Sequence, residues 1–139
     1  MARRFYEKGC HFIAAAILLR QKGGDEYVVL HLICQGVEII LKAILLLRNY
    51  AKYQPRLTRY GHRLMLLATD ASKEFKLKPL RPTLLAELKE LDRLYAGQVL
   101  RYSLPASVLI DPKSTPTELV LRRTLAILRL THRELARKT

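Results

Sequence analysis

The chain has 139 residues, the size of one domain, and half of them are hydrophobic, which excludes an intrinsically disordered protein. Lys and Arg number 25 against 12 Asp and Glu, so the formal net charge is +13. A basic excess of this size favours polyanionic partners, with nucleic acid first and an anionic membrane surface second. The two cysteines, Cys10 and Cys34, are too few for a disulfide framework, and we expect both to be reduced in a cytoplasmic protein.

Hydrophobic residues recur at helical spacing in five segments, with Gly or Pro residues between them, and no segment alternates with the period of a strand. The predicted helices span residues 2–21, 25–52, 62–76, 82–95 and 116–137. Asp25 is the expected N-cap of the second helix, and Thr115 with Glu118 forms a capping box at the start of the last. We therefore predict an all-α fold, an antiparallel bundle of about five helices in a single domain, residues 1–139.

Three helices carry residues whose environment the sequence predicts. The run Ala14-Ala15-Ala16 would let another helix approach the first one closely. On the fourth helix acidic and basic residues alternate, which favours a solvated face over acid–base chemistry. These acidic residues are Glu87, Glu90 and Asp92. The leucines of the last helix that are expected to face the core are Leu121, Leu125, Leu128 and Leu135.

The second helix is apolar on nearly every side from Tyr27 to Leu47, a pattern typical of a buried helix. It is also long enough to span a membrane, but Glu and Lys are costly within lipid, so we expect a soluble bundle and no membrane. Its polar residues are spaced four, three and four apart and lie on one face. This polar seam comprises His31, Gln35, Glu38 and Lys42. Either it meets solvent or a neighbouring subunit's polar rim, or it lines a cleft or a dimer interface.

No acidic residue occurs between Glu38 and Asp70, and basic residues there are interleaved with tyrosines. Cations bind phosphates and tyrosine rings stack on unpaired bases, so this segment suits nucleic acid. The predicted nucleic-acid-binding residues are Lys52, Arg56, Arg59, Arg63, Tyr53 and Tyr60. The alternative is an ordinary solvated helix end and loop. A second basic surface along the last helix is expected to be simply its outer face, and comprises Arg122, Arg123, Arg129, Arg133, Arg137 and Lys138.

Signatures of cofactor chemistry are absent from the sequence. It has no P-loop, no Gly-rich dinucleotide fingerprint, no Cys-x-x-Cys and no His-Glu-x-x-His. The four histidines have no metal-ligand spacing among themselves. We therefore predict neither a cofactor nor a metal site.

The order of several motifs resembles the HEPN superfamily (higher eukaryotes and prokaryotes nucleotide-binding). An alanine-rich helix is followed by HLICQGVEIILKAILLL, RYGHRLMLLA and LDRLYAGQVLRY. Glu38 and Lys42 match a Glu-x-x-x-Lys pair on the second helix, and Gly61 and His62 begin a Gly-His-x-Leu at the third. The late pair Arg101-Tyr102 is similar to an Arg-Tyr-Pro element, with Ser in place of the proline. The resemblance covers roughly residues 5–103.

The resemblance implies a helical bundle, usually dimeric, that binds RNA or nucleotide, often in a defence or toxin system. Many members are metal-independent ribonucleases with an Arg and a His separated by four to six residues, and five residues separate Arg56 from His62. In the family this motif opens a late helix with a polar residue after the Arg, whereas Leu57 follows here. As catalytic residues, His62 would exchange protons with the ribose and the leaving oxygen, and Arg56 would stabilise charge on phosphorus.

Two functions of different classes follow. The first is an RNA- or nucleotide-binding homodimer, with ribonuclease activity left open. Its interface is expected to bury part of residues 97–115 or the end of the central helix, because shorter helices leave apolar surface uncovered. The second is a non-catalytic module that pairs with an antitoxin-like nucleotidyltransferase or another protein partner.

Overall fold

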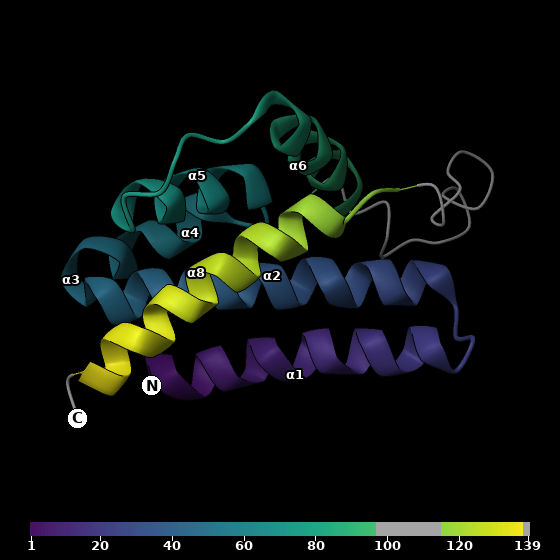
Figure 1. The fold of residues 1–139 in the computed structure, drawn as a ribbon, viewed down its shortest axis with the longest axis horizontal. Helices are drawn as coiled ribbons and strands as arrows, with labels where there is room; N and C mark the ends of the chain where they lie inside the picture. Colours follow the sequence, from purple (N-terminus) through teal and green to yellow (C-terminus); the bar gives the residue numbers. More distant parts are fainter. Residues whose placement is uncertain (97–114, 138–139) are drawn as a thin grey trace.

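The computed structural model describes residues 1–96 and 115–137, and this part of the chain is helical with no strand (Figure 1). The long helices are α1 (Ala2–Gln21), α2 (Glu26–Arg48), α5 (Leu64–Glu74), α6 (Pro82–Tyr95) and α8 (Glu118–Arg137). Short helical turns link α2 to α5, namely α3 (Tyr50–Tyr53), the 3-10 helix η1 (Gln54–Arg56) and α4 (Leu57–Tyr60). The predicted all-α bundle is confirmed, with each of the five predicted helices in place.

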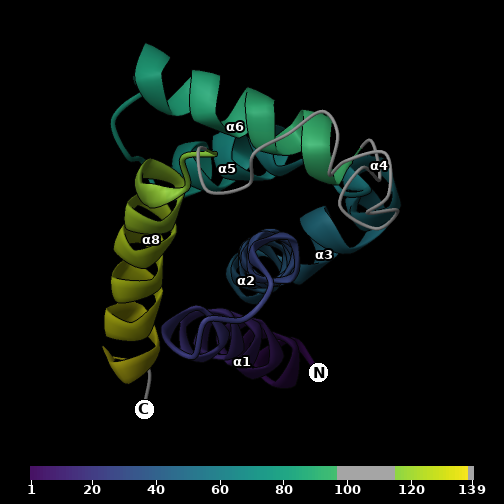
Figure 2. The ribbon, with the colours of Figure 1, turned by 90° about the vertical axis from the view of Figure 1, so that its right-hand side faces the viewer.

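Helix α2 lies at the centre of the bundle, as the end-on view in Figure 2 shows. Helix α1 runs along one side of it, α8 crosses a second side, and α5 and α6 cover a third. This enclosure explains a helix that is apolar nearly all round. Its start is also as predicted, because the Asp25 carboxylate accepts the N–H groups of Tyr27 at 2.9 Å and Val28 at 3.1 Å.

By length and composition α2 could also cross a membrane, with a mean hydropathy of 2.0 over its most apolar 18-residue window. In the structure, however, 72% of that window is buried inside the protein. A buried core helix passes a hydropathy test as readily as a membrane span does, so the absence of a membrane stays a prediction.

The central helix ends at Arg48, earlier than the predicted end near Lys52. Asn49 leaves the helical conformation with φ −154°, and its side chain accepts the N–H of Lys52 at 3.1 Å. Asn49 is therefore an N-cap that starts α3. The three short turns fold the chain back along the bundle and bring Gly61 and His62 against α2.

Helices α1 and α2 are in close contact at two glycines. A Cβ atom on Gly9 would lie 2.7 Å from Cγ1 of Ile40, and one on Gly36 would lie 3.1 Å from the Gly9 carbonyl oxygen. Of the alanine run, only Ala16 is buried, while Ala14 and Ala15 are exposed. The alanine run thus contributes Ala16 to the core, and the close contacts at Gly9 and Gly36 had not been predicted.

Two acidic side chains of α6 do not face solvent, contrary to the prediction. Asp92 Oδ1 accepts the N–H of Leu64 at 2.6 Å, and Glu87, which is 5% exposed, accepts the N–H of Val120 at 3.0 Å. These amides lie in the first turns of α5 and α8, where backbone N–H groups lack partners within their own helix. The two carboxylates thus cap helices that are distant in sequence, whereas Glu90 pairs at the surface with Arg93 as expected.

The last helix starts later than predicted and has a different cap. Helix α8 begins at Glu118, and the Glu118 side chain pairs with Arg122 instead of closing a capping box with Thr115. Glu87 satisfies the Val120 amide in its place. A cap supplied by another helix carries no local sequence signal, because it depends on tertiary contact.

We expect Asp92→Ala to lower the free energy of unfolding by about 1–2 kcal/mol, because two N–H groups at the start of α5 lose their acceptor. Urea denaturation measures this value. Glu90→Ala, on the same helix, is the matched control and should change it by less than about 0.5 kcal/mol, since its ion pair is exposed. Equal values for both variants would contradict the capping role of Asp92.

The buried face of α8 is rotated from the predicted one. The side chains facing the core are Val120, Thr124, Ile127 and Thr131, whereas Leu125 is 45% exposed. Leu121 and Leu128 pack only at the edge of the core, and the Leu135 side chain lies outside the described residues. The two threonines can be buried because their hydroxyls donate to carbonyls one turn back, at 2.8 and 3.0 Å.

Candidate functional site

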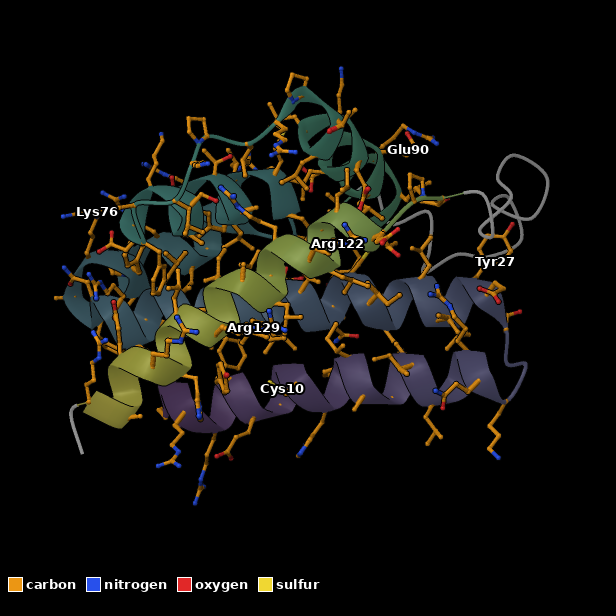
Figure 3. The ribbon with its side chains drawn as sticks, in the orientation of Figure 1. Cys10, Tyr27, Lys76, Glu90, Arg122 and Arg129 are labelled. Atoms are coloured by element: carbon orange, nitrogen blue, oxygen red, sulfur yellow. The ribbon has the colours of Figure 1, made fainter. Side chains whose placement is uncertain are left out.

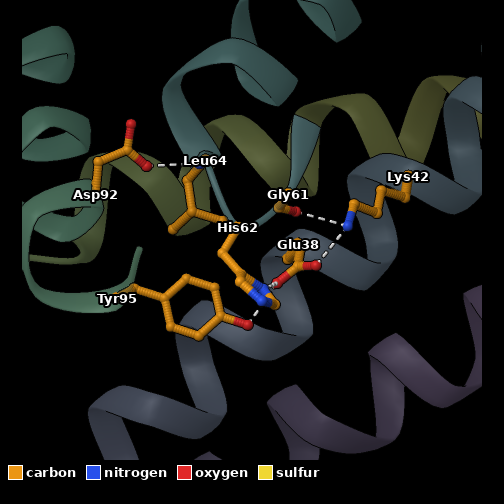
Figure 4. Close-up of polar contacts among 7 residues, drawn as sticks. All are labelled: Glu38, Lys42, Gly61, His62, Leu64, Asp92 and Tyr95. Atoms are coloured by element: carbon orange, nitrogen blue, oxygen red, sulfur yellow. Dashed lines mark hydrogen bonds and ion pairs between the residues drawn. The ribbon is translucent and has the colours of Figure 1, made fainter. Parts of the chain in front are cut away.

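The polar seam of α2 is directed inward at its centre, toward the turn before α5 and toward α6 (Figure 4). Glu38 is 6% exposed, and three groups donate to its carboxylate. Lys42 Nζ lies 2.6 Å from Oε1, while the Tyr95 hydroxyl at 2.5 Å and His62 Nδ1 at 3.0 Å both contact Oε2. Of the two sequence interpretations, a solvent-facing stripe is therefore wrong for Glu38 and Lys42.

A glycine turn positions His62 and also satisfies Lys42. Gly61 has φ +52° and ψ −123°, a conformation that residues with a Cβ rarely adopt. Its carbonyl oxygen accepts from Lys42 Nζ at 2.7 Å, so the ammonium bridges Glu38 and the turn. The turn is thereby tied to α2 on one side, and the next residue, His62, reaches the same carboxylate.

Tyr95 completes the cluster from the end of α6. Its side chain is 1% exposed, and its ring makes edge contacts with both histidines. The centroid distances are 5.5 Å to His62 and 5.7 Å to His31. The helical spacing of Leu84, Leu88, Leu91 and Tyr95 is typical of an inward face, but nothing in the local sequence shows that the Tyr95 hydroxyl reaches Glu38. Gln35, the remaining seam residue, is half-buried on the same face of α2.

The charges of the cluster follow from these contacts. Burial by itself raises the pKa of Glu38, but hydrogen bonds from His62, Lys42 and Tyr95 outweigh it and hold the pKa below its ordinary value. An ionised carboxylate only accepts hydrogen bonds, so Nδ1 of His62 must carry a proton. In the neutral form of this imidazole Nε2 is the acceptor nitrogen, and the side chain is 41% exposed. This arrangement suits proton transfer at Nε2.

The cations predicted to bind nucleic acid lie at the surface around α3 and α4. These exposed side chains are Lys52, Arg56, Arg59 and Arg63. Arg63 donates to the Arg59 carbonyl at 2.8 Å, and Arg56 lies over the Tyr53 ring at 5.8 Å from its centroid. Lys52 pairs with Glu74 of α5 at 2.9 Å. The segment between Glu38 and Asp70 contains no acidic residue of its own, but in the folded chain the Glu74 carboxylate of α5 lies beside one of its cations.

The predicted role of Tyr53 and Tyr60 in base stacking is corrected. Their side chains are 2% and 4% exposed, because the rings pack into the core. The Tyr53 hydroxyl donates to Glu74, and the Tyr60 hydroxyl donates to Asp70 at 2.5 Å. Rings held this way have no open face for a base. Tyr50, which is 52% exposed, is the tyrosine of this segment that keeps its ring at the surface.

The two predicted catalytic residues, Arg56 and His62, contact different neighbours in the structure. His62 lies against Glu38 and Tyr95, whereas the Arg56 guanidinium lies over Tyr53. His62 is therefore the residue whose orientation the fold specifies. The Arg101-Tyr102 element lies outside the described residues.

On α8 the expected outer basic face is present at Arg122, Arg129, Arg133 and Arg137, and Figure 3 shows Arg122 and Arg129 along it. Lys138 lies outside the described residues. Arg123 differs from them, because its guanidinium nitrogens lie 3.2 Å from Ser72 Oγ of α5. Arg123 is thus half-buried between helices and is not part of the solvated face.

Within residues 1–96 and 115–137, no group of three or more His, Cys, Asp or Glu side chains could hold a metal ion. Cys10 and Cys34 are both free thiols, and burial raises the pKa of Cys34. Comparison with protein-family profiles, curated proteins and solved structures finds no match for the chain. The functional argument therefore rests on the geometry around His62.

Proposed function

We propose that this chain is a HEPN-like helical domain that binds RNA or nucleotide, and that His62 serves as an acid–base residue in metal-independent RNA cleavage. The observation that carries the proposal is the 3.0 Å contact of a half-exposed His62 with the buried, ionised Glu38. A carboxylate that orients an imidazole in one tautomer is a recurrent part of general acid–base sites. The exposed arginines of η1, α4 and the turn before α5 carry positive charge that can bind the phosphates of RNA.

The chemistry needs a base, a proton donor and a cation. Nε2 of neutral His62 would take the proton of a ribose 2′-hydroxyl, whose oxygen attacks the adjacent phosphorus. The phosphorus–O5′ bond breaks, giving a 2′,3′-cyclic phosphate, and the 5′-oxygen takes up a proton. In a homodimer the imidazolium of a second copy would supply that proton. Arg59 or Arg56 would stabilise the charge that develops on the phosphorane oxygens.

RNA binding is expected to weaken steeply with salt and to depend on the α3–α4 arginines. The combined change of Arg56, Arg59 and Arg63 to Gln should reduce the slope of log affinity against log salt by about 2, because roughly 0.7 counterion is released per phosphate contact on a single strand. Fluorescence anisotropy with a labelled single-stranded RNA over a salt series measures this slope.

The matched control removes the same charge from α8 by changing Arg129, Arg133 and Arg137 to Gln. This variant should keep the wild-type slope. If the slope of log affinity against log salt falls equally in both triple variants, RNA binding depends only on net charge. The α3–α4 surface is then not the binding site.

A second candidate, the non-catalytic module with a protein partner, is favoured by exposed apolar side chains at the α1–α2 end. Ile17 is 52% exposed, Leu18 58% and Val28 47%. Exposed apolar surface commonly marks an interface, here one for a different protein. The homodimer of the first function has its own predicted interface, of which residues 97–114 lie outside the described residues. Light scattering that gives a monomer mass at micromolar concentration would remove the homodimer.

A further inference from the structure

A basic hollow lies between the loop before α6, the start of α6 and the first half of α8. Its volume is roughly 330 Å³, at the lower end of the range for small-molecule sites. Among residues 1–96 and 115–137, four cations line it, together with apolar side chains that include Leu84 and Leu119, and no carboxylate does. The cations are Lys78, Arg81, Arg122 and Arg123. Within the described residues only Arg122 of these four pairs with a carboxylate, that of Glu118.

Arg123 is fixed in the hollow by neutral groups. Its guanidinium donates to Ser72 Oγ at 3.2 Å and to the Lys78 carbonyl oxygen. Partial burial lowers the pKa of this guanidinium. A positive charge that leaves water is normally matched by a negative one, and the facing groups on α5 and the loop supply only uncharged oxygens.

The start of α6 borders the same hollow. Arg81 is the N-cap residue of α6 and forms no side-chain cap. Thr83 and Leu84, in the first turn, both line the hollow. First-turn amides of a helix have no partner within the helix and favour anions. The four cations and the first turn of α6 therefore border one space, which Leu84 and Leu119 also line.

We propose that this hollow binds a phosphomonoester whose organic part is a flat ring. The phosphate would lie among Lys78, Arg81 and Arg123, because arginine guanidinium groups bind phosphate oxygens in pairs and lysine contributes point charge. The ring would lie on Leu84 and Leu119. The inference deepens the nucleotide-binding part of the proposed function, on which it rests, by naming a site and a ligand class. The site shares none of the residues assigned to RNA binding or to the His62 cluster, so it can fail while RNA cleavage stands.

Isothermal titration of the whole chain with inorganic phosphate, AMP and adenosine tests the proposal. AMP should bind several-fold more tightly than inorganic phosphate, and adenosine should not bind measurably. The double variant Lys78→Gln/Arg81→Gln should weaken AMP binding at least about tenfold, since it removes two exposed cations of the site. The control Lys22→Gln/Lys89→Gln removes the same charge from exposed positions elsewhere and should bind AMP as the wild type does.

Ala126→Leu tests the shape of the hollow without changing charge. Ala126 is an exposed lining residue on α8, so the larger side chain should reduce AMP affinity and leave phosphate affinity unchanged. Any of three results would overturn the site: no binding of either phosphate compound, adenosine binding as tightly as AMP, or equal losses in the double variant and its control. His62→Ala should bind AMP normally, which separates this site from RNA cleavage.

Discussion

His62→Ala is expected to reduce cleavage of single-stranded RNA in EDTA by a factor of about 10² to 10⁴, the usual contribution of a general acid–base residue. The substitution removes the imidazole that Glu38 orients and that is 41% exposed. Gel separation of the products from a mixed-sequence RNA measures the rate, and the 2′,3′-cyclic phosphate ends identify the mechanism. EDTA should leave the wild-type rate unchanged, because no step uses a metal ion.

His132→Ala is the matched control, since this histidine is exposed on α8, away from the Glu38 cluster. It should cleave at the wild-type rate. Equal activity of wild type and His62→Ala would assign any cleavage to a contaminant or another site. An inactive wild type that still binds RNA would leave the chain a binding module.

Glu38→Ala is expected to lower the free energy of unfolding by about 3–5 kcal/mol, the cost of leaving a buried charge without its partner. Lys42, with 12% of its side chain exposed, would lose its carboxylate, and the Tyr95 hydroxyl and His62 would lose an acceptor. Urea denaturation followed by circular dichroism measures this value. Glu7→Ala is the control, because Glu7 also pairs one turn away, with Arg3, but at the surface. It should cost less than about 0.5 kcal/mol.

Stability should also depend on pH through Glu38. Its pKa is lower in the folded chain than the ordinary 4.5, so the folded state holds the charged form more strongly than the unfolded state does. The resulting stabilisation is complete above pH 4.5 and is lost as the pH falls through the folded pKa. Glu38→Gln should remove this part of the acid dependence. An unchanged pH profile in that variant would show that the carboxylate is not ionised in the folded protein.

Local sequence by itself determined the helices and one of their caps. Asp25 is predicted as an N-cap because it follows two glycines and precedes the apolar helix, and the amides that it accepts lie only two and three residues ahead. The central place of α2 followed from its apolar composition, which requires cover on several sides. The spacing of His31, Gln35, Glu38 and Lys42 placed them on one face, since helical geometry repeats within a single segment. All of these features involve residues within a few positions of each other.

Only the tertiary structure decided what these faces meet. His62 and Tyr95 reach Glu38 across 24 and 57 positions of sequence, and Glu87 caps a helix 33 positions away. An acidic residue on a helix has the same local pattern whether it faces water or the N-terminus of another helix, so the buried roles of Glu87 and Asp92 had no sequence signal. Tyr53 and Tyr60 were likewise predicted at the surface from their basic neighbours, but carboxylates of α5 accept their hydroxyls inside the fold. Charge and polarity are local properties, whereas burial depends on which distant segment packs against them.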